Sequence, residues 1–223
     1  LNAGFINSVA LLSFANNAVS HVTGTVTLVA NALAAGDWTF LWYTGSIVLS
    51  FLAGAIMSGM VVGDEALQLG RRYGIALLIE AALLGLAWYG FTHEQHYAEW
   101  LASAACGLQN ALVATYSGSV IRTTHLTGIV SDIGSAIGHF LANRVLNRVQ
   151  LILQCSIVVA FVTGAALGGV LFGWVGYNAV LLNALLVLAV ASAAVGATRE
   201  GRPGAQRWVL PACVPGRGPP EPS

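Results

Sequence analysis

The 223-residue chain contains no lysine and few charged side chains of either sign. Charged residues make up 8% of the sequence, whereas an ordinary soluble domain has about 25%. Hydrophobic residues reach 57% and the mean hydropathy is +0.75. This composition excludes a soluble globular domain and predicts an integral membrane protein in a lipid bilayer. Nine arginines balance nine carboxylates, so net charge gives no reason to expect a nucleic-acid partner.

Signatures of catalysis and of metal or cofactor binding are also missing. Without lysine there is no G-x-x-x-x-G-K phosphate loop, and neither H-E-x-x-H nor G-x-S-x-G occurs. The three cysteines, at positions 106, 155 and 213, are far apart and form no C-x-x-C pair. We therefore predict that the protein is not an enzyme and holds no metal and no cofactor.

Long apolar runs indicate an all-α, polytopic membrane protein with six transmembrane helices. A helix needs about 20 apolar residues to cross a hydrocarbon core about 30 Å thick. The expected segments are residues 1–35, 40–62, 73–91, 101–141, 151–172 and 177–197. Residues 1–197 would form a single transmembrane domain. The proline-, glycine- and arginine-rich residues 198–223 are predicted to be a disordered cytoplasmic tail.

The first and fourth of these segments are too long for one straight crossing. At 1.5 Å per residue, residues 1–35 would extend about 50 Å as one helix. Polar residues interrupt both segments near the motifs His21-Val22-Thr23-Gly24 and His125-Leu126-Thr127-Gly128. Hydroxyl groups there can satisfy backbone groups that a break would free. We therefore expect both helices to be broken, with Gly24 and Gly128 in the breaks.

Arginines are distributed unequally between the two sides of this arrangement. Arg71, Arg72, Arg144, Arg148 and the tail arginines fall on one side, whereas Asp37, Glu94 and Glu99 fall on the other. By the positive-inside rule the arginine side is cytoplasmic. This predicts a multi-pass protein of the inner (plasma) membrane with cytoplasmic N- and C-termini.

The two halves of the chain resemble each other. Besides the His-x-Thr-Gly motifs, Gly4 and Asn7 match Gly107 and Asn110, and the block 51–55 matches 161–165. Repeat 1 covers about 1–91 and repeat 2 about 101–197. Three crossings per repeat would place the copies in opposite orientations. Transporters with such inverted repeats bind substrate near the membrane midplane, on discontinuous helices.

Several of these stretches also carry a resemblance to a known family. They are Ala3-Gly4-Phe5-Ile6-Asn7-Ser8, Val19-Ser20-His21-Val22-Thr23-Gly24-Thr25, Gly107-Leu108-Gln109-Asn110 and Arg122-Thr123-Thr124-His125-Leu126-Thr127-Gly128. Together they make the chain similar to the YoaK-like family of bacterial membrane proteins, whose function is unknown. The resemblance implies six helices, distantly similar to half of a major-facilitator transporter. A homodimer would then supply the other half.

Arg122 and Glu80 are the sharpest polar signals, because a charge at the bilayer centre costs at least about 2.5–3.5 kcal/mol. Arg122 is either an anion-binding group in a substrate site or half of a buried ion pair with Glu80 or Asp132. Glu80 is either a proton relay or an interhelical hydrogen-bonding group. Asp132 we interpret as an interfacial residue.

The motif histidines also allow two interpretations. His21 and His125 could shuttle protons, since an imidazole titrates near pH 6.5, or their ring nitrogens could hold the helix breaks. The predicted substrate-binding set contains residues in and around both motifs: Arg122, His21, His125, Thr23, Thr124, Thr127, Asn110 and Tyr116. Glu80 and His125 form the predicted proton relay.

Two functions fit these observations. One is a secondary transporter or permease-like protein that moves a small polar or anionic solute, with proton coupling. The alternative is a non-transporting membrane scaffold, sensor or lipid-binding protein, in which the same residues form a closed polar network.

Overall fold

In the computed structural model, residues 1–14, 16–62, 71–116, 125–142 and 147–199 are described, the side chains of 116 and 197–199 excepted. Within these ranges the chain is all-α, as predicted, without a β-strand. The helices are α1 (Asn2–Leu12), α2 (Val22–Ala35), α3 (Trp38–Val62), α4 (Arg71–Thr92), α5 (Tyr97–Tyr116), α6 (Leu126–Leu141), α7 (Arg148–Val175) and α8 (Asn178–Arg199).

Four of these helices are long and apolar enough to cross a membrane. They are α3, α4, α7 and α8, the last over Asn178–Gly196, whereas α1, α2 and α6 are shorter apolar helices. Large apolar side chains are exposed along them, including Leu49, Leu52, Val159, Val162 and Leu185. Exposed aliphatic surface of this extent suits lipid rather than water. The protein is therefore a membrane protein.

The two predicted segments that were too long for one crossing are each divided into two helices. Residues 1–35 contain α1 and α2, and the segment predicted at 101–141 contains most of α5 and all of α6. His21 (φ −91°, ψ 62°) and His125 (φ −87°, ψ 51°) are the N-cap residues of α2 and α6 and share nearly the same backbone conformation. The two motifs are thus helix starts.

The predicted position of the breaks needs a correction. Gly24 and Gly128 lie inside the first turns of α2 and α6 rather than in the interruptions. The first amide groups of any helix lack intrahelical partners, so a glycine there frees no further backbone group. In the first segment the interruption lies before His21, between Leu12 and Val22.

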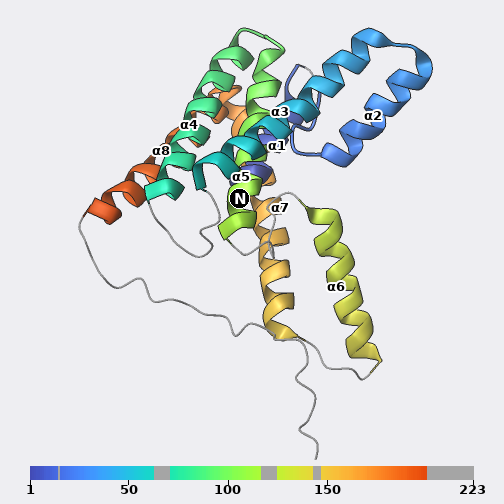
Figure 1. Cartoon of the computed structure of the whole chain (residues 1–223), viewed down its shortest axis with the longest axis vertical. Coiled ribbons are helices and arrows are strands. Elements are labelled where there is room, and N and C mark those ends of the chain that lie inside the picture. The colour runs from blue at the N-terminus through green and yellow to red at the C-terminus, as the bar shows by residue number, and fades with distance from the viewer. Residues whose placement is uncertain (15, 63–70, 117–124, 143–146, 200–223) are drawn as a thin grey trace, which may run out of the picture.

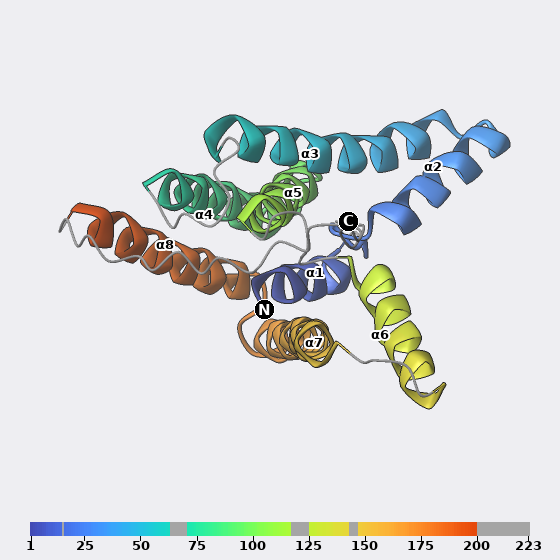
Figure 2. The ribbon, with the colours of Figure 1, turned by 60° about the horizontal axis from the view of Figure 1, so that its bottom comes forward.

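The helices pack in pairs that join distant parts of the chain. The main contacts are α3 with α5, α4 with α8, α1 with α7 and α4 with α5. Figure 2 shows α3 on one side of the molecule, α7 on the opposite side, and α4, α5, α8 and α1 between them. Helix α2 packs on α3, and α6 packs on α7. These two helices diverge toward opposite ends of the molecule (Figure 1).

Glycines bring the paired backbones into direct contact. A β-carbon on Gly4 would collide with the Phe161 carbonyl, and one on Gly107 would collide with the Phe51 carbonyl. Gly164 meets the Leu1 carbonyl, and Gly54 meets that of Ala104, in the same manner. Small residues allow such close helix packing in membranes. These contacts join α1 with α7 and α3 with α5.

Small side chains also fill the core between α4, α5 and α8. On these three helices the alanines with 0–1% exposure are Ala76, Ala87, Ala98, Ala102, Ala105, Ala179 and Ala191. Larger buried side chains, Leu84, Phe91, Leu108 and Leu112, occupy the same cluster. The polar cavities lie outside this core, one where α2 and α6 begin and the other between α6 and α7.

Candidate functional site

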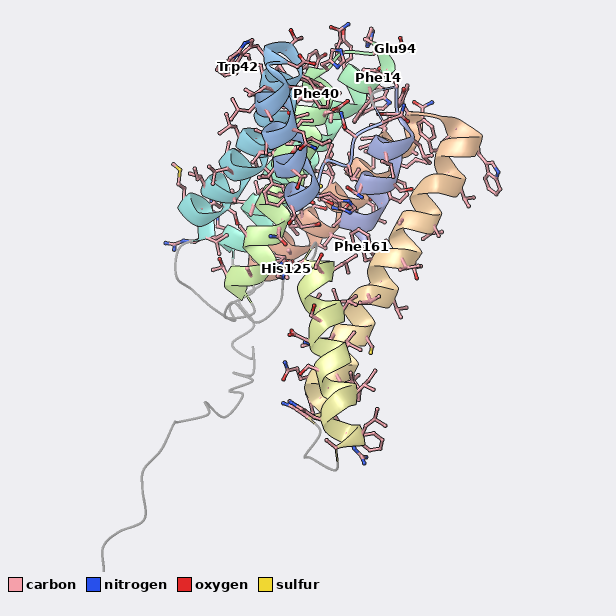
Figure 3. The ribbon with its side chains drawn as sticks, turned by 90° about the vertical axis from the view of Figure 1, so that its right-hand side faces the viewer. Phe14, Phe40, Trp42, Glu94, His125 and Phe161 are labelled. Carbon is pink, nitrogen blue, oxygen red and sulfur yellow. The ribbon has the colours of Figure 1, made fainter. Side chains whose placement is uncertain are left out.

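The two His-x-Thr-Gly motifs meet at one cavity of about 510 Å³. We call it the central cavity. It is lined by Ser20, His21, Val22, Thr23, Gly24, Phe51, Asn110, His125, Leu126 and Thr127. The motifs lie 104 residues apart in the sequence, and the fold brings them together. In Figure 3, His125 lies well below the end of the molecule that carries Trp42 and Glu94, at the start of α6.

The cavity is bordered by the first turns of two helices. Both α2 and α6 begin there, directly after His21 and His125. Amide groups in a first turn lack intrahelical acceptors, and the helix dipole makes this end partly positive. Two such ends, two imidazoles and the Thr23 and Thr127 hydroxyls give the cavity hydrogen-bond donors suited to a polar or anionic ligand.

The chain before His21 is held in place by buried hydrogen bonds. The Ser20 backbone N–H (3.2 Å) and Oγ (2.8 Å) both donate to Asn7 Oδ1. Ser103 Oγ on α5 donates to the carbonyls of Val19 (3.1 Å) and Ile47 (2.9 Å). The described residues 13–14 and 16–21 therefore belong to a loop fixed to α1, α3 and α5, which we call the entry loop. Its fixation determines where His21 stands.

The two halves of the cavity differ at their glycines. A β-carbon on Gly128 would lie 2.6 Å from both Cε1 and Nδ1 of His125, whereas one on Gly24 would meet no atom within 4 Å. The His125 imidazole thus folds over Gly128. His21 makes no such contact with Gly24, so the two histidines present their rings differently to the cavity.

The structure brings together part of the predicted substrate-binding set. His21, Thr23, Asn110, His125 and Thr127 all line the central cavity. Arg122 and Thr124 lie outside the described residues, as does the Tyr116 side chain. Their roles, and the proposed ion pairs of Arg122, stay predictions from the sequence.

Glu80 does not line the central cavity but is buried between helices, with 1% exposure. Its Oε1 accepts a hydrogen bond of 2.6 Å from Asn2 Nδ2, and Asn183 Nδ2 donates to Asn2 Oδ1. Its Oε2 has no partner among the described residues. Glu80 thereby links α4 with α1 and, through Asn2, with α8. This arrangement supports the interhelical interpretation of Glu80 within this part of the chain.

A second buried carboxylate, Glu99, was missed at the sequence level. It was expected on an outer acidic face, but its exposure in the first turn of α5 is 0%. Tyr43 Oη donates to Glu99 Oε2 at 2.5 Å, and Asn17 Nδ2 donates to Tyr43 Oη at 3.0 Å. One signal could have revealed it: Ala98, Ala102 and Ala105 form a small-residue row, which indicates a packed helix that starts before Glu99.

A smaller cavity of about 220 Å³ lies between α6 and α7. Its lining is mostly polar: Asp132, Ser135, Ala136, His139, Asn147, Gln150, Leu151 and Gln154. Gln154 Nε2 donates to Asp132 Oδ2 at 2.9 Å. Asp132, predicted as an interfacial residue, thus faces a polar space between two helices. Across the described ranges no three His, Cys, Asp or Glu side chains gather into a metal-binding group.

Comparison with known proteins adds a family but no activity. A family model described as "Protein of unknown function (DUF1275)" matches residues 1–193, and the chain belongs to this family. The membership agrees with the resemblance to the YoaK-like family. No curated protein and no solved structure matches the chain.

Proposed function

We propose that this member of an uncharacterised membrane-protein family is a secondary transporter or permease-like protein for a small polar or anionic solute. One observation carries the proposal: both His-x-Thr-Gly motifs line a single cavity. Its volume of about 510 Å³ falls in the range of small-molecule sites, about 300–1,000 Å³.

The chemistry of the lining supports a polar or anionic solute. No carboxylate is among the described residues that line the central cavity, whereas two helix N-termini, hydroxyl groups and an amide are. Such ends bind carboxylate or phosphate groups well. Arg122, three residues before His125 in the sequence, is proposed to add a guanidinium fork for the same anion.

The proposed architecture is six crossings in two inverted repeats. Helices α1 with α2, and α5 with α6, would each make one broken crossing, and α3, α4, α7 and α8 would make one each. The glycine contacts support this assignment, because Gly4 with Phe161 and Gly107 with Phe51 join matched positions of the two repeats in exchanged roles. Two-fold pseudosymmetry requires such an exchange.

The proposed orientation is in the inner membrane with both termini cytoplasmic. Arg71 and Arg148 begin α4 and α7, whereas Trp42 and Glu94 lie together at one end of the molecule (Figure 3). Trp42 is 70% exposed, as suits an interfacial anchor. A homodimer is proposed to complete the transporter, with Glu80 and His125 in its proton relay.

Uptake by purified protein in liposomes tests the function. We would measure accumulation of a panel of small carboxylates, phosphates and neutral polar solutes, with and without a proton gradient. His21→Ala and His125→Ala should each lower uptake of the accepted solute at least about tenfold, the factor that corresponds to one lost hydrogen bond to a charged group. His93→Ala is the matched control, because His93 is exposed and lies outside the cavity.

A protein that transports nothing in the panel, and whose thermal stability no solute changes, would contradict the proposal. The result would favour the alternative, a non-transporting scaffold, sensor or lipid-binding protein. The hydrogen bond from Asn2 to Glu80 Oε1 fits that alternative for this one residue. In either case we propose that the protein is not an enzyme.

A further inference from the structure

Glu99 is a buried carboxylate at the end of the molecule that carries Trp42. Its exposure is 0%, and its Oε1 has no hydrogen-bond partner among the described residues. The ring of His96 lies 5.5 Å from that of Phe14, and Figure 3 shows Phe14 and Trp42 at the same end. The carboxylate therefore lies near one surface but is shielded from it.

Within the described ranges, the side chains that act on Glu99 include no permanent cation. Tyr43 of α3, Asn17 of the entry loop and His96 between α4 and α5 are the side chains that act on it. The His96 imidazole is exposed and lies 5.1 Å, ring to ring, from Tyr43. A buried carboxylate without a fixed positive partner is stabilised by taking up a proton. These surroundings favour proton binding at Glu99.

The same side chains connect Glu99 to the central cavity. Asn17, which donates to Tyr43, belongs to the entry loop, and so do Ser20 and His21 of the cavity lining. One turn further along α5, Ser103 holds the Val19 carbonyl of that loop. A change at Glu99 therefore has a short, continuous route to the residues that border the cavity.

We propose that Glu99 is a proton-binding site, which protons reach from the Trp42 end past His96. The charge of Glu99 controls how firmly the hydrogen bonds through Tyr43 and Asn17 hold the entry loop. The proton adds to the free Oε1 and converts the carboxylate to a carboxylic acid. This step needs no other reactant. The inference rests on the proposed function, because it adds Glu99 as a further proton-binding group to the proposed relay of Glu80 and His125 and links it to the same cavity.

The direction of the effect follows from the hydrogen bonds. When Glu99 is ionised, Tyr43 donates to a charged acceptor, and such bonds are about twice as strong as neutral ones. When Glu99 is protonated, this bond weakens, and the Asn17 contact behind it loses its support. A fall in pH should therefore loosen the entry loop, and a rise should tighten it.

Hydrogen–deuterium exchange of the purified full chain, corrected for the intrinsic effect of pH, tests this directly. In the wild-type protein, the amides of residues 16–21 of the entry loop should exchange about fivefold faster below the titration of Glu99 than above it, the difference between a charge-assisted and a neutral hydrogen bond. Glu99→Gln should show the faster rate at every pH. Tyr43→Phe, which removes the hydroxyl between Glu99 and Asn17 but keeps the carboxylate, should also show the faster rate at every pH.

Glu94→Gln is the matched control, since Glu94 is exposed in the connection before α5, and it should behave as wild type. Equal, pH-independent exchange in wild type and Glu99→Gln would overturn the proposal. So would protection that follows sodium concentration at constant pH. Faster exchange throughout α4 and α8 would show that a variant is unfolded, in which case the wild-type pH dependence alone decides. No solute is needed, so a failure here is separate from a failure of transport.

Discussion

Gly4 on α1 lies so close to the Phe161 carbonyl of α7 that a β-carbon at residue 4 would overlap that oxygen. Gly107 on α5 has the same relationship to the Phe51 carbonyl of α3. Backbone carbonyls cannot rotate away as side chains can. Any larger residue at either position must therefore separate two helices.

Gly4→Ala and Gly107→Ala should each destabilise the protein by about 1–3 kcal/mol, as overpacked sites do. Gly45→Ala and Gly59→Ala on α3 are the controls, because a β-carbon there meets no atom within 4 Å, and they should change stability by less than about 0.5 kcal/mol. Thermal unfolding in detergent, followed by circular dichroism, measures the difference. Equal losses in all four variants would contradict the close contacts.

Gly128→Ala should displace the His125 imidazole from its position, whereas Gly24→Ala should leave His21 unaffected. The first substitution places a methyl group 2.6 Å from His125 Cε1, and the second places one in open space. Once a solute is identified, its dissociation constant should rise about tenfold in Gly128→Ala, the factor for a lost charge-assisted hydrogen bond, and stay near the wild-type value in Gly24→Ala. Similar constants for both variants would show that the His125 ring does not contact the solute.

Glu80→Gln separates a structural role from a relay. The amide oxygen of Gln can still accept the hydrogen bond from Asn2, so stability should change by less than about 0.6 kcal/mol, the average for such bonds in membranes. Gln cannot take up a proton. If Glu80 is only structural, the pH dependence of uptake will match wild type, and a loss of that dependence at unchanged stability would establish the relay.

The polar face of α6 should be accessible to water from the α7 side. Ser131 and Ser135 follow Thr127 at four-residue spacing, and Ser135 lines the cavity shared with α7. In a cysteine-free background, Ser135→Cys should react with a hydrophilic thiol reagent at least about tenfold faster than Ile137→Cys, because ionised thiols form poorly in lipid. Ile137 is exposed on α6 and does not line that cavity. Equal reactivity would mean that no hydrated space separates α6 from α7.

Features that depend on local sequence were predictable. The excess length of two apolar segments indicated two interruptions, and the polar residues near His21 and His125 indicated where to look. The prediction that Gly24 and Gly128 lie in the breaks was wrong, because both lie inside helices. A glycine beside hydroxyl side chains suggests a break, yet Gly24 and Gly128 lie in first turns. The amide groups of a first turn lack intrahelical partners in any case, so glycine is tolerated there.

The surroundings of the two buried glutamates could not be predicted. Glu99 follows a hydrophilic stretch, 92–97, and is buried only because Tyr43 and the entry loop cover the start of α5. The contact between Asn2 and Glu80 joins residues 78 positions apart. Such burial arises from packing between helices that are distant in the sequence, so the residue pattern of one helix alone cannot predict it.

The pairing of α1 with α7 also sets an order for the protein's biogenesis. Gly4 leaves the ribosome well before residue 161, whose carbonyl it packs against. At roughly 5–20 residues per second, α1 must wait on the order of 10–30 s for its partner to be synthesised. During that interval the face of α1 that carries Gly4 cannot pack against α7. The nascent chain thus depends on lipid, the insertion machinery or a temporary neighbour until its second half arrives.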